Sequence, residues 1–275
     1  MTMTTTDHRW LRVVAAVSVL AAASVSPAWG QEPSSTGARV EAEVARQPEG
    51  GVTAEAQAVL DRMTATLNSL KRVSVSADIT RDELLTFGYK LQNNESARMW
   101  VEKPNRLRLE LKGDIKHRTY VYDGSKLTMV VPDLNIYAET AAPDTLAELV
   151  RTLLAAGVEM PLIDMLYHGT AGSLTEDVRA GLVVGDSTVD GVLTDHLAFR
   201  QPLVDWQLWV EKGAQALPRK LLITTRYQVG DPQYQAILRW DLKPNIGATT
   251  FTFVPPADAT KIPYKTELAA SGGAQ

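Results

Sequence analysis

The stretch TDHLAFRQPLVDWQLWVEKG, residues 194–213, holds the side chains best suited to chemistry. Two tryptophans and four ionisable groups lie close together there; the four groups are Asp195, His196, Arg200 and Asp205. A histidine beside a carboxylate is the pair with which hydrolases activate a hydroxyl nucleophile. The sequence therefore raises a choice between an active site and the polar face of a sheet.

Alternation along the stretch favours the sheet. Successive side chains of a strand point to opposite faces, and one face of two predicted strands is apolar: Leu197, Phe199, Trp206, Leu208 and Val210. We expect the acid, base and cation on the opposite, solvated face, as cross-strand polar pairs. No serine or threonine lies in a recognisable nucleophile elbow. We therefore expect no enzymatic activity, with a hydrolase as the alternative.

Other chemical signals are missing from the sequence. The chain has no cysteine, which excludes disulfides, thiolate metal sites and a cysteine nucleophile. His117 and His168 stand apart, without the spacing of a metal site, and glycines occur singly at turns rather than in phosphate-binding loops. We expect no catalytic residue, no metal and no cofactor.

The first thirty residues resemble an export signal. A basic start is followed by a short apolar run, Val13–Val25, and by Ala28 and Gly30 at the positions that a signal peptidase requires. A membrane-spanning helix needs about 20 apolar residues, so we expect cleavage after Gly30 and a soluble protein in the periplasm, not an integral membrane protein. Cleavage removes two arginines and one aspartate and changes the formal charge from −4 to −5. This acidic balance argues against a nucleic-acid partner.

The sequence of the mature chain predicts one folded domain between two polar ends. Residues 31–52 are rich in Pro, Ser, Gly and Glu, and we expect a disordered linker there. The domain is expected over 53–265 and a flexible tail over 266–275. It opens with a helix, because Thr53 is a suitable N-cap and apolar residues recur at helical spacing up to Leu70.

From Val73 the apolar period changes to two, which predicts strands. Turn residues separate segments at 73–88, 89–103, 106–113, 117–124, 126–133, 135–141, 178–189, 194–201, 205–213, 218–227, 234–242 and 249–256. Two helices interrupt them: 144–156, with Thr145 and Glu148 as a capping box, and 161–169. The fold class is therefore mainly β with α. About eleven strands form an antiparallel sheet long enough to curl, with helices covering its dry face.

Three segments carry a resemblance to a known family. MWVEKPNRLRLEL, YVYDGSKLTMVVPDLNIYA and TTFTFVPPADA resemble, in order and spacing, the signatures of LolA, the periplasmic carrier of outer-membrane lipoproteins. The segments VDWQLWVEKG…LPRKLLIT and DGVLTDHLAFRQ resemble more closely a family of predicted periplasmic proteins of unknown function. The resemblance spans about residues 54–261. It implies an incomplete antiparallel barrel whose concave, apolar face is closed by an N-terminal helix and lid helices.

The resemblance also implies a ligand site. Acyl chains enter the cavity of such carriers, and we expect the lining to comprise Leu107, Leu109, Leu111, Met129, Leu197, Phe199, Trp206, Leu208, Leu149 and Leu153. The carrier's lid latch is an arginine, and Lys103 stands at its position here. Lysine offers a point charge instead of a planar fork of donors.

Two functions follow as hypotheses. The first is a monomeric periplasmic binding or carrier protein for an acylated or apolar ligand, such as a lipoprotein, in envelope lipid handling. The alternative is an envelope interaction or sensor module that binds a protein partner and whose concave face is a filled core. Co-purified lipid distinguishes the first from the second.

Overall fold

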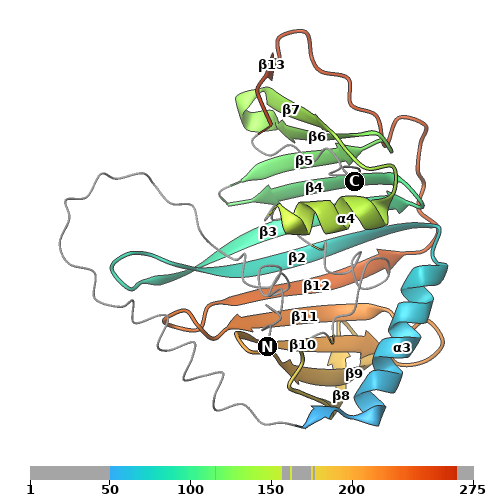
Figure 1. Cartoon of the computed structure of the whole chain (residues 1–275), viewed down its shortest axis with the longest axis vertical. Coiled ribbons are helices and arrows are strands. Elements are labelled where there is room, and N and C mark those ends of the chain that lie inside the picture. Colours follow the sequence, from blue (N-terminus) through green and yellow to red (C-terminus); the bar gives the residue numbers. More distant parts are fainter. Residues whose placement is uncertain (1–49, 115, 157–161, 163–174, 176, 265–275) are drawn as a thin grey trace, which may run out of the picture.

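The structure is a computed structural model that describes residues 50–114, 116–156, 162, 175 and 177–264. Its centre is one sheet of 13 strands in the order β1-β8-β9-β10-β11-β12-β2-β3-β4-β5-β6-β7-β13 (Figure 1). Neighbouring strands are antiparallel except at the two edges, where β1 runs parallel to β8 and β13 parallel to β7. The edge strands do not pair with each other, so the sheet is an incomplete barrel.

The elements follow the chain in a simple order. The strands are β1 (Gly51–Val52), β2 (Arg72–Leu84), β3 (Lys90–Glu102), β4 (Arg106–Gly113), β5 (His117–Tyr122), β6 (Lys126–Val131), β7 (Ile136–Ala141), β8 (Ala180–Val189), β9 (Val192–Arg200), β10 (Val204–Glu211), β11 (Pro218–Thr225), β12 (Gln233–Asp241) and β13 (Thr260–Lys261). The helices are α3 (Ala54–Ser69), α4 (Leu146–Ala155) and the short 3-10 helix η1 (Pro132–Leu134).

The eleven longer strands, β2 to β12, confirm the predicted count and fold class. Turn residues act as expected: Asp190 and Gly191 join β8 to β9 with φ of 48° and 79°, the positive angles that a tight two-residue hairpin requires. The first edge strand corrects the predicted linker, because Gly51 and Val52 pair with Ala180 and Gly181 of β8.

The predicted strand at 249–256 is wrong. Its first residues form turns, in which the amide of Thr250 donates to Gly247 and that of Thr252 to Thr249, each at 3.1 Å. Pro255 and Pro256 follow and lack the N–H that a ladder needs. The place beside β7 is taken by β13 instead.

Both described α-helices begin at the threonines that the sequence indicates. The hydroxyl of Thr53 accepts from the Ala56 amide at 3.3 Å, and that of Thr145 accepts from the Glu148 amide at 3.2 Å. These bonds satisfy N–H groups that a helix start leaves unpaired. The predicted helix at 161–169 and the predicted signal peptide lie outside the described residues, apart from the buried Leu162.

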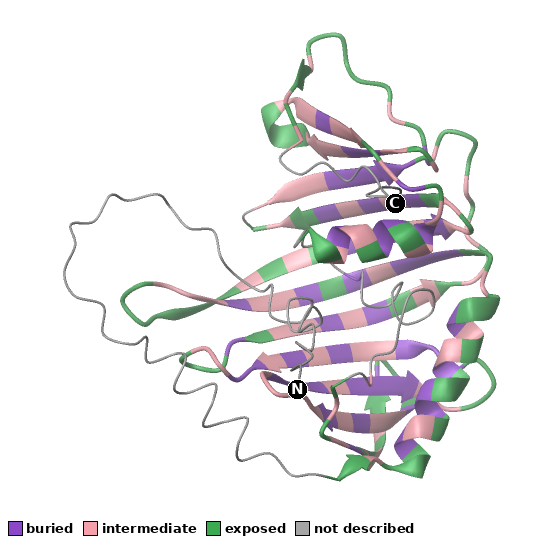
Figure 2. Ribbon diagram, in the orientation of Figure 1, coloured by how far each residue is buried: buried purple, intermediate pink, exposed green. Residues whose placement is uncertain are grey.

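The two faces of the sheet differ as the alternation predicts (Figure 2). We call the face that carries α3 and α4 the inner face. Burial alternates along β4, where Leu107, Leu109 and Leu111 are buried while Arg108 and Glu110 are half-buried. Helix α4 lies across β3 and β4, and α3 crosses the strand ends from β8 to β12 (Figure 1).

Candidate functional site

The inner face brings together the ten residues predicted to line a ligand site. Nine of them are at most 4% exposed and belong to one apolar cluster: Leu107, Leu109, Leu111, Leu149, Leu153, Leu197, Phe199, Trp206 and Leu208. Met129 is half-buried and packs against that cluster. They come from β4, β6, β9, β10 and α4, so the face is apolar from one side of the sheet to the other.

An aromatic pair forms part of this face. Phe199 of β9 lies opposite Trp206 of β10, and their rings stack with centroids 3.9 Å apart and planes 15° from parallel. Both side chains are almost fully buried, at 3% and 4% exposed. A Cβ at Gly181 would lie 2.6 Å from the Phe199 ring, so glycine is required on β8 for this ring to fit.

The middle of the inner face carries short side chains that the sequence analysis did not single out. Ala77, Ala97 and Ala236 lie on β2, β3 and β12 and are at most 3% exposed. Ala77 and Ala97 are direct cross-strand partners. A strand's alternation predicts which face they take, but the strand order is needed to place them together. The inner face thus has a few short side chains in its middle, among larger ones such as Met99 and Leu238 on the same strands.

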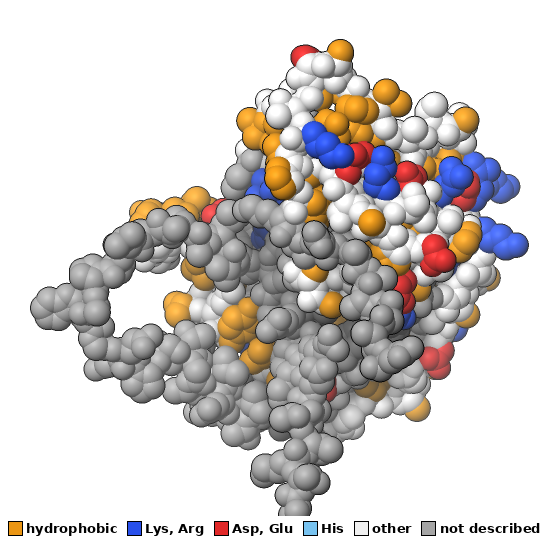
Figure 3. Space-filling view, turned by 45° about the horizontal axis from the view of Figure 1, so that its top comes forward, with side chains coloured by type: hydrophobic (Ala, Val, Ile, Leu, Met, Phe, Trp, Pro, Cys, Tyr) orange, Lys and Arg blue, Asp and Glu red, His pale blue; other side chains and the backbone are white. Residues whose placement is uncertain are grey.

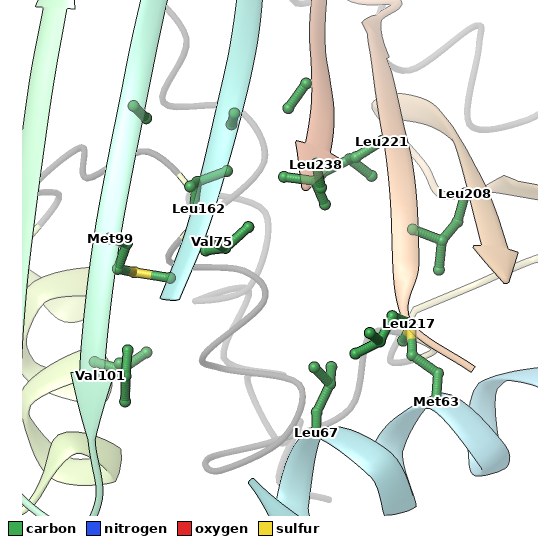
Figure 4. Packing of buried hydrophobic residues seen from close by; sticks show 14 of the residues in the cluster. Met63, Leu67, Val75, Met99, Val101, Leu162, Leu208, Leu217, Leu221 and Leu238 are labelled. Carbon is green, nitrogen blue, oxygen red and sulfur yellow. The ribbon is translucent and has the colours of Figure 1, made fainter. Parts of the chain in front are cut away.

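Helix α3 contributes apolar side chains to the same cluster. Met63 and Leu67 project from α3 toward the strands, where Val75, Leu238 and Leu221 belong to the facing sheet (Figure 4). Burial of such side chains stabilises the fold by about 1.5–3 kcal/mol each. The helix is therefore held to the inner face by packing.

The turn between β3 and β4 fastens both helices at one end of the sheet. The ammonium of Lys103 donates to the Leu67 carbonyl in the last turn of α3 at 2.8 Å. The carbonyl of the next residue, Pro104, accepts from the Leu146 amide at the first residue of α4 at 2.9 Å. We call residues 103–105 the helix joint.

Lys103 was expected to be the lid latch, and the carbonyl that it reaches belongs to α3 and not to α4. Partial burial lowers the pKa of Lys103 from its ordinary value, through loss of water around the ammonium. The cation suits this position, because the C-terminal carbonyls of a helix carry partial negative charge. It is Pro104, through its carbonyl, that holds the start of α4.

A buried phenol adds a second fixing point for α4. Tyr122 of β5 is fully buried, and its hydroxyl donates to the Pro143 carbonyl at 2.5 Å, three residues before α4 begins. Burial, together with Asp144 and Asp123, raises the pKa of Tyr122 to about 12. The phenol therefore stays a neutral donor throughout the physiological range.

The inner face ends in charged groups on the side opposite the helix joint. Glu95 lies in line with Ala97 on β3, and burial raises the pKa of its carboxyl, partly offset by Arg81, Lys116 and Arg118. Arg118 is the cross-strand partner of Leu111, so it shares that face. The apolar surface thus passes into a polar margin at this end.

The chemically suggestive stretch forms cross-strand pairs, and its acid and base do not contact each other. His196 stacks on Trp209 with centroids 4.2 Å apart, and its Nε2 lies 2.9 Å from the Gln207 side-chain oxygen. Arg200 binds Asp205 through two hydrogen bonds of 2.8 and 2.7 Å, which raise its pKa. These groups serve as polar partners on the outer face.

Asp195 corrects the prediction that all four polar groups share the wet face. It lies opposite Val210 in the β9–β10 register, so it belongs to the inner face with Leu197. Its carboxylate is 13% exposed and pairs with Arg62 of α3 at 2.9 Å and with Lys212 at 3.3 Å. It therefore anchors α3 at the edge of the apolar surface.

Two features are absent from the part of the chain that the structure describes. Among those residues, no group of three or more His, Cys, Asp or Glu side chains could hold a metal ion. Within the same part of the chain, no helix combines the length and the apolar character needed to cross a membrane.

Solved structures with a similar fold share little sequence with this chain. The lipoprotein LppX of Mycobacterium tuberculosis is 13% identical with a TM-score of 0.45, covering 70% of this chain and 98% of its own. LprF of Mycobacterium bovis is 14% identical with a TM-score of 0.43, covering 76% and 100%. A LolA superfamily protein of Nitrosomonas europaea is 9% identical with a TM-score of 0.34, covering 72% and 97%.

Sequence comparison gives a family. No curated protein matches the chain. A family model described as "Predicted periplasmic protein (DUF2092)" matches residues 56–264, which include α4, all but the first two residues of α3 and every described strand except β1. The chain therefore belongs to this family of predicted periplasmic proteins.

Proposed function

We propose that this protein is a periplasmic binding protein that holds an acylated or otherwise apolar ligand against the inner face. The observation that carries the proposal is the continuous apolar surface from β4 to β10 of an unclosed sheet, covered in part by helices that one turn fastens at one end. Apolar surface of this extent binds ligands without directional contacts, in proportion to the area removed from water.

Helix α4 is the element that a ligand would displace. Its apolar side, Leu149, Val150 and Leu153, lies in the core cluster, while its start is held by Pro104. Exposing three such side chains costs about 5–9 kcal/mol, and each methylene of an acyl chain returns about 0.8 kcal/mol on burial. A chain of roughly 6–11 methylenes therefore offsets the opening.

This balance predicts a threshold in chain length. Short acyl chains should not bind, and affinity should rise steeply with each added methylene once the opening is offset. The polar margin around Glu95 and Arg118 would receive the ligand's headgroup.

A second function is favoured by the near-complete burial of the predicted lining. Nine of its ten residues are at most 4% exposed, as expected of a filled core. In that case the protein is an envelope interaction or sensor module, and a protein partner binds elsewhere on its surface.

Two experiments distinguish the binding protein from the filled core. One is purification from the periplasm followed by native mass spectrometry, and the other is titration with fluorescent acyl probes of increasing length. Ala77→Leu enlarges one of the short side chains in the middle of the inner face and should weaken probe binding. Ser76→Leu, the next residue on the outer face, is the matched control. Failure to bind probes of any length overturns the carrier proposal and favours the filled core.

A further inference from the structure

The tip of the β2–β3 hairpin is an exposed apolar feature that the inner face does not use. We call residues 85–91 the hairpin tip. Phe87 and Tyr89 are 70% and 66% exposed, and Leu91 is 43% exposed. Among the described residues, Phe87 and Tyr89 are the exposed aromatic side chains. The hairpin extends beyond the ends of its neighbours at the left of Figure 1, and hydrophobic side chains gather there in Figure 3.

The tip has a defined conformation. The Leu85 amide donates to the Tyr89 carbonyl at 2.8 Å, and the Gly88 amide donates to the Leu85 carbonyl at 2.9 Å. Gly88 has a φ of +89°, which permits this tight turn. The rings of Phe87 and Tyr89 meet edge to face, 5.4 Å apart. The two rings are thus presented together.

A second apolar side chain lies on the adjoining loop. Val229, between β11 and β12, is 76% exposed. The following residue contacts the hairpin: Lys90 donates to the Gly230 carbonyl at 3.3 Å, and Leu84 lies against Gly230. The loop therefore widens the apolar surface beside the tip.

The size and shape of this surface indicate its partner. Large aromatic side chains bury about 150–250 Å² each, so the two rings offer roughly 300–500 Å², to which the two aliphatic neighbours add a smaller area. A stable protein interface needs about 800 Å² from each side. A projecting turn with Phe and Tyr, the latter bearing a polar hydroxyl, matches side chains that settle at the boundary between lipid headgroups and acyl chains.

We propose that the hairpin tip inserts into the surface of a phospholipid bilayer. The tip lies at the far end of β3 from the helix joint, about 40 Å away for a strand of 13 residues. It is therefore on the side where the inner face ends in its polar margin. The insertion stands on the exposed tip alone and does not require the proposed ligand site.

Co-sedimentation of the full mature chain with vesicles of phosphatidylethanolamine and phosphatidylglycerol tests the insertion. The double variant Phe87→Ser with Tyr89→Ser should lose about tenfold or more in vesicle binding. The matched control is Leu134→Ser with Val254→Ser, two positions exposed by 67% and 78% elsewhere on the molecule. The control variant should bind as the native chain does.

A single fluorescent label supplies a second measurement, since the chain has no cysteine of its own. An environment-sensitive dye on Thr86→Cys should shift to the blue with vesicles, while the same dye on Asn68→Cys in α3, near the helix joint, should not. If the native chain does not bind vesicles, or if both double variants lose vesicle binding equally, the insertion is overturned and a protein partner for the tip remains. Probe titrations of the same variants keep the two proposals separate, because tip variants should still bind acyl probes.

Discussion

At one end of β3, Lys103 and Pro104 bind both helices, whereas at the other end the hairpin tip bonds mainly within itself. The β2–β3 pair that connects these ends is the longest in the sheet, with 13 residues in each strand. One end is a structural joint in which Lys103 and Asn105 are half-buried, and the other is an exposed surface. The hairpin thus has one end that holds the fold together and one end that is exposed, as is common where a rigid scaffold carries an exposed loop.

The contrast also explains where charge is tolerated. Near the joint, Lys103 meets a helix carbonyl and is half-buried, whereas Lys90 at the start of β3 meets Asp82 at 3.3 Å and is 44% exposed. Between them the inner side of β3 passes from the apolar Ala97 and Met99 to the charged Glu95. Substitutions along the hairpin and its neighbours should therefore destabilise the fold most in the dry middle and least at the tip.

The largest effect is expected for Leu109→Glu, which places a charge on the dry face between the two ends. Leu109 is fully buried, and a buried unpaired charge combined with the loss of core packing should cost about 4 kcal/mol or more. Chemical denaturation followed by circular dichroism measures this cost.

Arg108→Glu is the control on the neighbouring residue. Arg108 is 27% exposed and pairs with Glu110 at 2.8 Å, so its loss should cost about 1 kcal/mol or less. Equal destabilisation by the two variants would contradict the assignment of faces.

An intermediate effect is expected at the helix joint. Lys103→Met keeps the length of the side chain but removes the donor to the Leu67 carbonyl, which should cost about 1–3 kcal/mol. Lys90→Met at the other end of β3 should cost less, about 1 kcal/mol, because the Lys90 side chain is 44% exposed and Asp82 keeps the hydrogen bond from the Gln233 amide.

Thermal unfolding of both lysine variants gives the comparison. Hydrogen exchange of α3 adds a local readout, since its last turn should exchange faster only in Lys103→Met. The same result in both variants would remove the distinction between the two ends.

A pH dependence follows from the phenol beside α4. Tyr122 has a pKa raised to about 12 in the folded protein, above the ordinary value of about 10. An acid with a raised folded pKa stabilises the fold fully below pH 10, and this contribution is lost as the pH rises toward 12.

The native chain should therefore exceed Tyr122→Phe in free energy of unfolding by a margin that decreases between pH 10 and 12. Urea unfolding across that range measures the difference, and contributions shared by both chains, such as that of Lys103, cancel. A difference independent of pH would mean that the phenol is not held as a buried donor.

Much of the fold could be predicted because the signals are local. Two-residue periodicity located β2 to β12, and Thr53 and Thr145 marked the helix starts that the structure has. The failure at 249–256 has a physical cause. Thr and Phe alternate over residues 250–253 as in a strand, but the two prolines that follow lack the N–H groups of a hydrogen-bonded ladder.

The candidate site was less predictable because it depends on contacts between distant elements. Asp195 continues the alternation of Leu197, yet its place on the inner face is stabilised by Arg62, 133 residues away in the chain. The pairing of Ala77 with Ala97 and the bond of Lys103 to Leu67 likewise require the assembled sheet. Periodicity gives the face of a residue and not the element that covers it.

The smallest effect on stability is expected at the tip, for Phe87→Ser. Its ring is 70% exposed and contacts Tyr89 at its edge, so the substitution removes little buried surface. Surface changes of this kind usually stay within about 0.5 kcal/mol, and the two backbone bonds that close the turn do not involve the ring. Equilibrium denaturation should therefore give the variant and the native chain nearly the same free energy of unfolding. A loss above about 1 kcal/mol would mean that the ring packs against the folded protein, and the tip would then belong to the structural part of the hairpin together with the helix joint.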